Sequence, residues 1–147
     1  EAPADGRLLV VYGSDFPSSV LSHIPKDLSE RCEFIYHRLP VDEFPVPPRT
    51  CQTAEAYERT LLERYRTTAK VVLTPLHHVA APCMAMGIPV VVCRSDVDDR
   101  FSFLETLTPI YTPDAFAEIN WRPEAVDVSQ VRNRIRDLLA QAVADAE

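Results

Sequence analysis

Two adjacent histidines, His77 and His78, are the residues of this chain best placed to do chemistry. They lie in segment 71–93, VVLTPLHHVAAPCMAMGIPVVVC, where an apolar β-branched run ends at Thr74 and a small-residue helix precedes Gly87. This pattern predicts a strand–helix–strand unit with the histidines at the carboxyl edge of a sheet, where ligands bind in open α/β sheets. An imidazole at that edge can bind a phosphate or a carboxylate, or act as a general acid or base.

Only one histidine of the pair is expected to face a ligand, because successive residues point in different directions. We assign this role to His77, as the candidate catalytic residue. We expect His78 either to hold the ligand-contacting groups in place or to face solvent. His78 and Thr74 are candidate ligand-binding residues. The alternative interpretation is a pair of packed or surface histidines near a helix start.

The expected helix start adds backbone donors to this edge. A helix that begins after a strand leaves N–H groups unpaired, and these groups and the helix dipole attract anions. Pro82 has no N–H, so a regular helix cannot run through it undisturbed. We therefore expect the helix to begin near Val79 or Ala80, with Pro82 in or near its first turn.

Other candidate ligand-binding residues follow the neighbouring strands. Gly13 lets the backbone approach a ligand after the first strand, and Ser14 can donate to a phosphate. Arg38 ends the second strand and can pair with an anion. Arg94 and Asp96 follow the strand after the histidine helix, where an acid can hold sugar hydroxyls. The alternative roles are an ordinary turn, solvent-exposed arginines and a helix cap.

Apolar runs and helical periodicities alternate along the chain. Strands are predicted at residues 8–12, 33–37, 70–73, 89–93 and 109–111, and helices within 17–30, 53–68, 77–86, 98–107, 113–119 and from 127 onward. This alternation favours a parallel sheet with helices on both faces. The predicted class is α/β, with a three-layer Rossmann-like sheet in a single domain that spans residues 1–147.

Two of the predicted helices carry further expectations. Thr53 is a good N-cap residue, so residues 38–52, with four prolines, are expected to form a long, stiff loop. The last helix has an apolar stripe that is expected to face inward, with arginines on its solvated face. The stripe comprises Val131, Ile135, Leu138, Leu139 and Ala142, and the arginines are Arg132, Arg134 and Arg136.

The composition indicates which classes of partner the chain can bind. The formal net charge of −7 disfavours nucleic acid, whose phosphates need a basic face, but allows a small anionic ligand held by local donors. The chain has 3 glycines, which argues against a glycine-rich phosphate loop.

The chain has no long apolar span, so no transmembrane segment is expected. The four widely spaced cysteines favour buried, reduced thiols and a cytoplasmic location, and we expect no metal site.

The stretch TPLHHVAAPCMAMGIPVVV resembles the C-terminal-half motif of the polysaccharide pyruvyl transferase family. In that motif a strand leads into an Arg-Leu-His-Gly-type turn, an Ala- and Leu-rich helix, a Gly-Ile-Pro or Gly-Lys-Pro turn and another strand. The later stretch DDRFSFLETLTPIYTPDAFAEINWRPEAVDV is similar to the tails of bacterial members. The resemblance covers about half of the chain, from Lys70 to the end.

The resemblance implies a GT-B-like architecture, with two Rossmann-like halves and an active site in the cleft between them. This chain would be the C-terminal half, and the chain start without Met also leads us to expect a longer protein. The implied partners are an N-terminal domain, an anionic small-molecule donor and a saccharide acceptor, with no separate cofactor. His77 aligns with the motif histidine at the donor site, where the family binds phosphoenolpyruvate.

The chain departs from the motif at two positions. Pro75 stands where the family has arginine, and His78 stands where the family has glycine. The lost guanidinium removes a bidentate anion clamp, which makes a nucleotide sugar an alternative donor. Arg94 and Arg100 are the candidate substitutes for that guanidinium.

The sequence supports three functional hypotheses. The first is a transferase domain of pyruvyl transferase type, acting in surface polysaccharide or glycoconjugate synthesis. The second is the nucleotide-sugar-binding half of a GT-B glycosyltransferase. The third is a non-catalytic domain that kept the fold and lost the chemistry, since a fold alone does not define a function.

Overall fold

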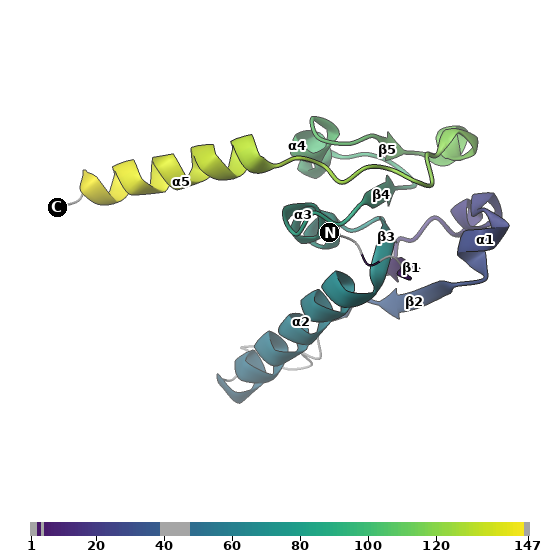
Figure 1. Ribbon diagram of the computed structural model, residues 1–147, viewed down its shortest axis with the longest axis horizontal. Coiled ribbons are helices and arrows are strands. Elements are labelled where there is room, and N and C mark those ends of the chain that lie inside the picture. The colour runs from purple at the N-terminus through teal and green to yellow at the C-terminus, as the bar shows by residue number, and fades with distance from the viewer. Residues whose placement is uncertain (1–2, 4, 39–47, 146–147) are drawn as a thin grey trace.

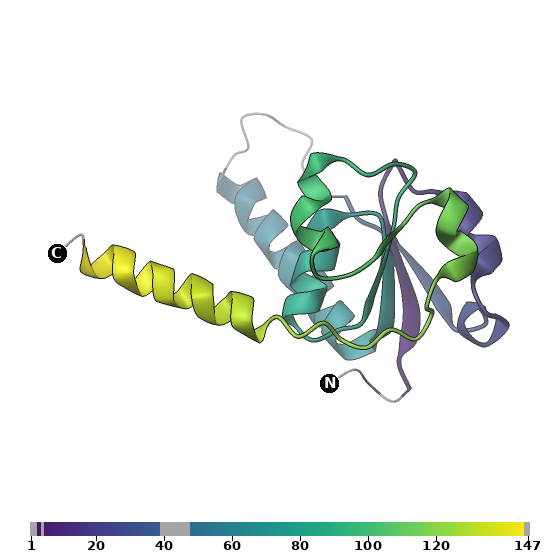
Figure 2. The same cartoon turned by 90° about the horizontal axis from the view of Figure 1, so that it is seen from above.

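Apolar runs form the five strands of one parallel sheet at the centre of the molecule (Figures 1 and 2). The structure is a computed structural model, and it describes residues 3, 5–38 and 48–145. The strand order is β2-β1-β3-β4-β5, and every pairing is parallel. The strands are β1 (Arg7–Tyr12), β2 (Cys32–Tyr36), β3 (Ala69–Thr74), β4 (Val90–Cys93) and β5 (Ile110–Tyr111).

The sheet separates two apolar cores. Successive side chains of a strand point to opposite faces, so Leu9 and Val11 of β1 enter one core while Leu8 and Val10 enter the other. All four are fully buried. A strand covered on both faces has to be apolar along its whole length, which explains why β1 is a continuous apolar run.

Helices cover both faces of the sheet, as Figure 1 shows. One face carries α2 (Pro48–Thr68), α3 (His77–Ala85), η2 (Asp99–Phe101) and α4 (Ser102–Glu105). The other face carries η1 (Ser18–His23), α1 (Lys26–Ser29) and η3 (Pro113–Glu118). This arrangement confirms the predicted α/β class with a three-layer Rossmann-like sheet. None of the described helices is both long enough and apolar enough to cross a bilayer.

Helix α2 begins at Pro48, so the prediction of a helix capped by Thr53 is wrong. Proline is well suited to the first position of a helix, because the N–H that it lacks would have no partner there and its φ angle already fits. The predicted loop over residues 38–52 is therefore wrong from residue 48 onward, and residues 39–47 lie outside the described part of the chain.

Helix α3 begins at His77, not near Val79 or Ala80 as predicted. The amides of Val79 and Ala80 both donate to the carbonyl of Leu76, at 3.1 and 2.9 Å, and these bonds start the helix ahead of Pro82. Pro82 thus lies inside the helix, where it cannot donate to the carbonyl of His78.

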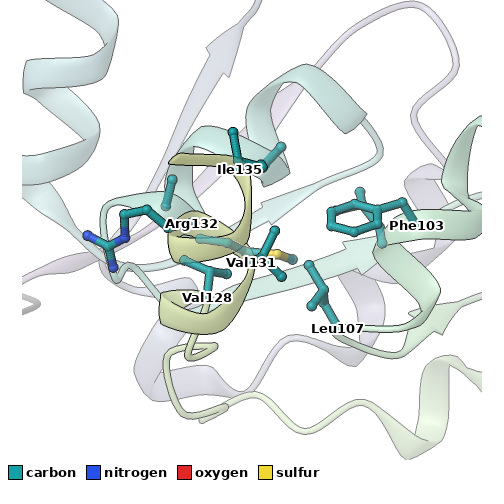
Figure 3. A pocket seen from close by; sticks show the side chains of 10 residues that line it. Phe103, Leu107, Val128, Val131, Arg132 and Ile135 are labelled. Atoms are coloured by element: carbon teal, nitrogen blue, oxygen red, sulfur yellow. The ribbon is translucent and has the colours of Figure 1, made fainter. Parts of the chain in front are cut away.

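The C-terminal helix α5 (Ser129–Ala144) projects from the body of the domain (Figure 2). The prediction that its apolar stripe faces inward is wrong: Ile135, Leu138 and Leu139 are 53%, 61% and 62% exposed. Only the first turns reach the body, where Val131 helps to line an apolar groove of about 290 Å³ against α3 and α4. Figure 3 shows this groove, with Phe103 across from Val131.

All four cysteines are free thiols. Cys83 and Cys93 are buried, as predicted, and burial raises the pKa of each thiol to about 12. Thiols with such a high pKa are unreactive, because the thiolate is the nucleophile. Cys32 is half-buried, and Cys51 is exposed on α2, so the prediction of buried thiols is wrong for Cys51.

Candidate functional site: two hollows at the carboxyl edge of the sheet

The strand order creates a crevice between the carboxyl ends of β1 and β3. The chain passes from β1 to β2 on one side and from β3 to β4 on the other, so the connections after these neighbouring strands diverge. Such a switch point is where open α/β sheets bind ligands, and this order is that of flavodoxin-like sheets. Gly13 and Ser14 follow β1 here, and the turn into His77 follows β3.

The turn from β3 into α3 leaves two backbone donors at this crevice. The hydroxyl of the buried Thr74 accepts a hydrogen bond from the amide of Leu76 at 3.1 Å, and the amides of Val79 and Ala80 are taken by the Leu76 carbonyl. Among the described residues, no acceptor is seen for the N–H groups of His77 and His78. These groups and the helix dipole together favour an anion at this point.

Both histidine side chains are exposed at the edge of a hollow of about 540 Å³. We call it the switch hollow, and the residues that line it come from the ends of β1, β3 and β4. They are Asp15, Pro75, Leu76, His77, His78, Arg94, Arg100 and Phe101. The ring of His77 meets Phe101 edge-on, with the ring centroids 6.0 Å apart. His77 is therefore held beside the hollow and accessible to a ligand.

Arg94 forms a rigid part of the wall. Its side chain is 12% exposed, and its guanidinium lies 4.5 Å above the centroid of the Phe101 ring. Nη1 donates to the carbonyl oxygen of Pro75 at 3.3 Å, and Nε donates to the backbone oxygen of Asp96 at 2.8 Å. These contacts bring a guanidinium from the end of β4 to the turn that follows β3.

Asp98 compensates the positive charge of this wall. Its carboxylate accepts hydrogen bonds from the backbone amide and the side chain of Arg100, and Arg94 approaches it at 3.5 Å. The hydrogen bond from the Arg100 side chain is the main reason why the pKa of Asp98 lies at about 2. Asp98 thus compensates part of the positive charge of the two arginines. The N–H groups at the start of α3 and the imidazoles of His77 and His78 remain as groups that can attract an anion.

A second hollow lies next to the first, at the end of β2. It is lined by His37, Arg38, Glu58 and His78, and we call it the β2 hollow. His78 belongs to both hollows and separates them. Its ring packs against that of His37, with the ring centroids 4.8 Å apart.

His37 has the most enclosed side chain of the ionisable residues described in the lining of the two hollows. Its backbone amide donates to the carbonyl of Tyr12 at 2.8 Å, and its side chain is 8% exposed. Nδ1 lies 3.4 Å from the Tyr65 hydroxyl, and Nε2 lies 3.7 Å from a carboxylate oxygen of Glu58. Burial lowers the pKa of His37, Glu58 opposes this shift, and the nearby His78 adds to it.

The structure brings together some of the predicted site residues and separates others. His77, His78 and Arg94 line the switch hollow, Arg38 and His78 line the β2 hollow, and Gly13 and Ser14 precede Asp15 on the adjoining loop. Two candidates lie elsewhere. The Thr74 side chain is fully buried in the turn, and the Asp96 side chain is 84% exposed, 3.7 Å from Arg94.

Sequence reasoning missed Glu58 and Tyr65. The two residues are seven positions apart on α2, which places them on one face of the helix, but that spacing is equally typical of a packed face. His37 stands at the end of a predicted strand, and this position could have drawn attention to its imidazole. No group of three or more His, Cys, Asp or Glu side chains able to hold a metal ion occurs in the described part of the chain.

Comparisons with protein-family models, with curated proteins and with solved structures found no match. The resemblance to the polysaccharide pyruvyl transferase family therefore stays a prediction. The fold and the geometry of the two hollows are the observations on which a functional proposal can rest.

Proposed function

We propose that this chain is a transferase domain of polysaccharide pyruvyl transferase type, which binds a phosphate-bearing donor in the switch hollow. One observation carries the proposal: at the β1/β3 switch point, His77 and His78 both line one accessible hollow, and their N–H groups have no acceptor within the described part of the chain. Backbone donors at a helix start suit a phosphate, and an imidazole suits proton transfer beside it. The proposed setting is the synthesis of surface polysaccharide or glycoconjugate, with a saccharide as the acceptor.

The proposed roles follow from the positions of the groups. His77 binds the anionic group of the donor or moves a proton to or from it, because its ring is exposed at the hollow and held by Phe101. Gly13 and Ser14 bound the same crevice from the end of β1. The Arg94 guanidinium contacts the backbone of Pro75, the position where the resembled family has arginine, and this contact supports Arg94 as a substitute anion-binding group.

A nucleotide sugar is the second candidate donor. The strand order β2-β1-β3-β4-β5 favours it, since flavodoxin-like sheets hold the phosphate of a nucleotide cofactor at the β1/β3 switch point. Phosphoenolpyruvate and a nucleotide sugar both present phosphate oxygens, so the switch hollow supports both. What differs between them is the part of the ligand beyond the phosphate.

Thermal unfolding with and without ligand tests the proposal. A ligand that binds only the native state raises the melting temperature, so millimolar inorganic phosphate, phosphoenolpyruvate or UDP-glucose should each do so. We expect His77→Gln to weaken phosphoenolpyruvate binding about tenfold, the size expected for one lost hydrogen bond to a charged group. His23→Gln is the matched control, because His23 is exposed on η1, which covers the opposite face of the sheet.

Two results would contradict the proposed function. The first is a melting temperature that none of the three compounds raises. The second is binding by the folded His77→Gln variant that equals binding by the unchanged protein, since His77 would then have no contact with the ligand.

A further inference from the structure

His78 forms a common wall between the two hollows, and this arrangement points to a ligand with two chemically different parts. The switch hollow offers the N–H groups at the start of α3 and the ring of His77. The β2 hollow shares His78 with the switch hollow, and its other imidazole, His37, packs against the His78 ring. A small molecule seated against His78 can therefore reach both hollows.

The β2 hollow suits a group that carries no net charge. Among the described residues, its lining contains one carboxylate from Glu58, one guanidinium from Arg38 and the imidazoles of His37 and His78. The carboxylate and the guanidinium carry opposite charges, so these residues provide no excess of positive charge that would favour a second phosphate. The Glu58 side chain is 38% exposed, and its carboxylate can accept hydrogen bonds from two neighbouring hydroxyls.

The groups behind this lining hold it in place. His37 lies between the Tyr65 hydroxyl and the Glu58 carboxylate, and its ring packs against His78. Tyr65 is itself almost fully buried. Because these side chains come from α2, from α3 and from the residue that follows β2, the packing of three elements fixes the position of Glu58 relative to the switch hollow.

We propose that the β2 hollow binds the hydroxyl-bearing part of a ligand whose phosphate occupies the switch hollow, so that the ligand is a sugar phosphate or a molecule that contains one. This inference rests on the proposed function, because it requires a phosphate in the switch hollow. Of the two candidate donors given above, it supports the second, a nucleotide sugar, because phosphoenolpyruvate has no hydroxyl groups to offer Glu58.

A pair of phosphate monoesters tests the inference. Glucose 1-phosphate and cyclohexyl phosphate share a six-membered ring and a phosphate, and only the sugar carries hydroxyl groups, a hydroxymethyl group and a ring oxygen. Both should shift the backbone amide NMR signals of residues 76–80. We expect glucose 1-phosphate alone to shift those of His37 and Glu58 and to bind about tenfold more tightly, as expected for hydrogen bonds to a charged acceptor.

Glu58→Gln removes the charged acceptor while keeping the shape of the side chain. We expect this variant to bind the two esters within about twofold of each other, because a hydrogen bond to a charged acceptor accounts for the tenfold preference. Its affinity for inorganic phosphate should be unchanged. Glu63→Gln is the control, because Glu63 lies on the same helix, is exposed and pairs with Arg66 at 2.7 Å; it should keep the preference.

The outcomes separate this inference from the proposed function. Equal affinity of the unchanged protein for the two esters, with both binding at residues 76–80, would overturn the inference and leave the phosphate site intact. A preference that survives Glu58→Gln would also overturn it. Failure of inorganic phosphate and both esters to bind would overturn the proposed function and the inference together.

Discussion

At the scale of single residues, His37 makes the stability of the fold depend on pH. Burial lowers its pKa below the ordinary value of 6.5, so between the unfolded and folded pKa values the unfolded chain binds more protons than the folded one. Stability is therefore complete above the unfolded pKa and falls as the pH decreases through this window. The neighbouring Glu58 reduces the shift, and His78 increases it.

Replacing His37 should remove this dependence. Urea unfolding of His37→Gln at several pH values between 5 and 7 is expected to give a smaller decrease in the free energy of unfolding than the unchanged protein shows. His23→Gln, which changes an exposed imidazole, should keep the original slope. Identical slopes for all three proteins would show that burial does not hold His37 in its neutral form.

Asp98 reduces the positive charge beside the switch hollow at the same scale, and Asp15 adds a further carboxylate in the lining itself. The Asp98 carboxylate accepts hydrogen bonds from Arg100 and lies 3.5 Å from Arg94, so its single negative charge partly offsets two guanidinium groups. Asp98→Asn keeps a good cap for the backbone amide of Arg100 and removes the negative charge. The two guanidinium groups would then attract an anion with less compensation.

We therefore expect Asp98→Asn to bind inorganic phosphate about threefold to tenfold more tightly at low ionic strength, with a smaller gain at high salt. Calorimetric titration at two salt concentrations measures both effects. Asp99→Asn is the matched control, since Asp99 is exposed and next in the chain. An unchanged or weaker affinity of Asp98→Asn would mean that neither arginine contributes to the anion site.

At the scale of elements, the sequence predicted strands better than helix ends. A buried parallel strand is an apolar run such as residues 8–12 or 89–93, and its presence can be read directly from composition. Helix starts depend on a few local bonds. Helix α3 begins at His77, where the Leu76 carbonyl accepts the first hydrogen bonds, whereas the predicted start was near Val79. Helix α2 begins at Pro48, whereas the predicted N-cap residue was Thr53.

The apolar stripe of α5 shows a second limit. Its periodicity predicts which side chains share a face, and it says nothing about what covers that face. In the structure Val131 and Ile135 line the groove beside Phe103 (Figure 3). Leu138 and Leu139 are 61% and 62% exposed on α5, which projects from the body of the domain (Figure 2). A prediction of an inward face needs a tertiary contact that the sequence of one helix does not contain.

The site was predictable to the extent that strand ends define it. The rule that ligands bind at the carboxyl edge led to His77, His78, Arg38 and Arg94, and all four line one of the two hollows. The adjacency of β1 and β3 could not be predicted, because strand order depends on the packing of the whole sheet. The contribution of Glu58 was missed because it requires the position of α2 against the sheet.

At the scale of the whole molecule, the two apolar cores close without α5. Their buried residues lie between Leu8 and Ile119, on both faces of the five strands. In contrast, α5 has no buried residue, and among its residues only Ser129 and Val131, both in the first turn, are half-buried. The cooperative unit of folding should therefore be the sheet with its two helical layers.

A chain that ends at Val128 tests this division. We expect it to fold and to unfold cooperatively, with a loss of about 1–3 kcal/mol, because only partly buried apolar contacts at Val131 and Ile135 are removed. Its inorganic phosphate affinity should equal that of the full chain, since α5 contributes no residue to either hollow. Circular dichroism during urea unfolding and a phosphate titration measure the two properties. Loss of cooperative unfolding would instead show that α5 belongs to the cooperative unit. The residues that line the groove of Figure 3 would then be the contacts through which α5 stabilises the domain.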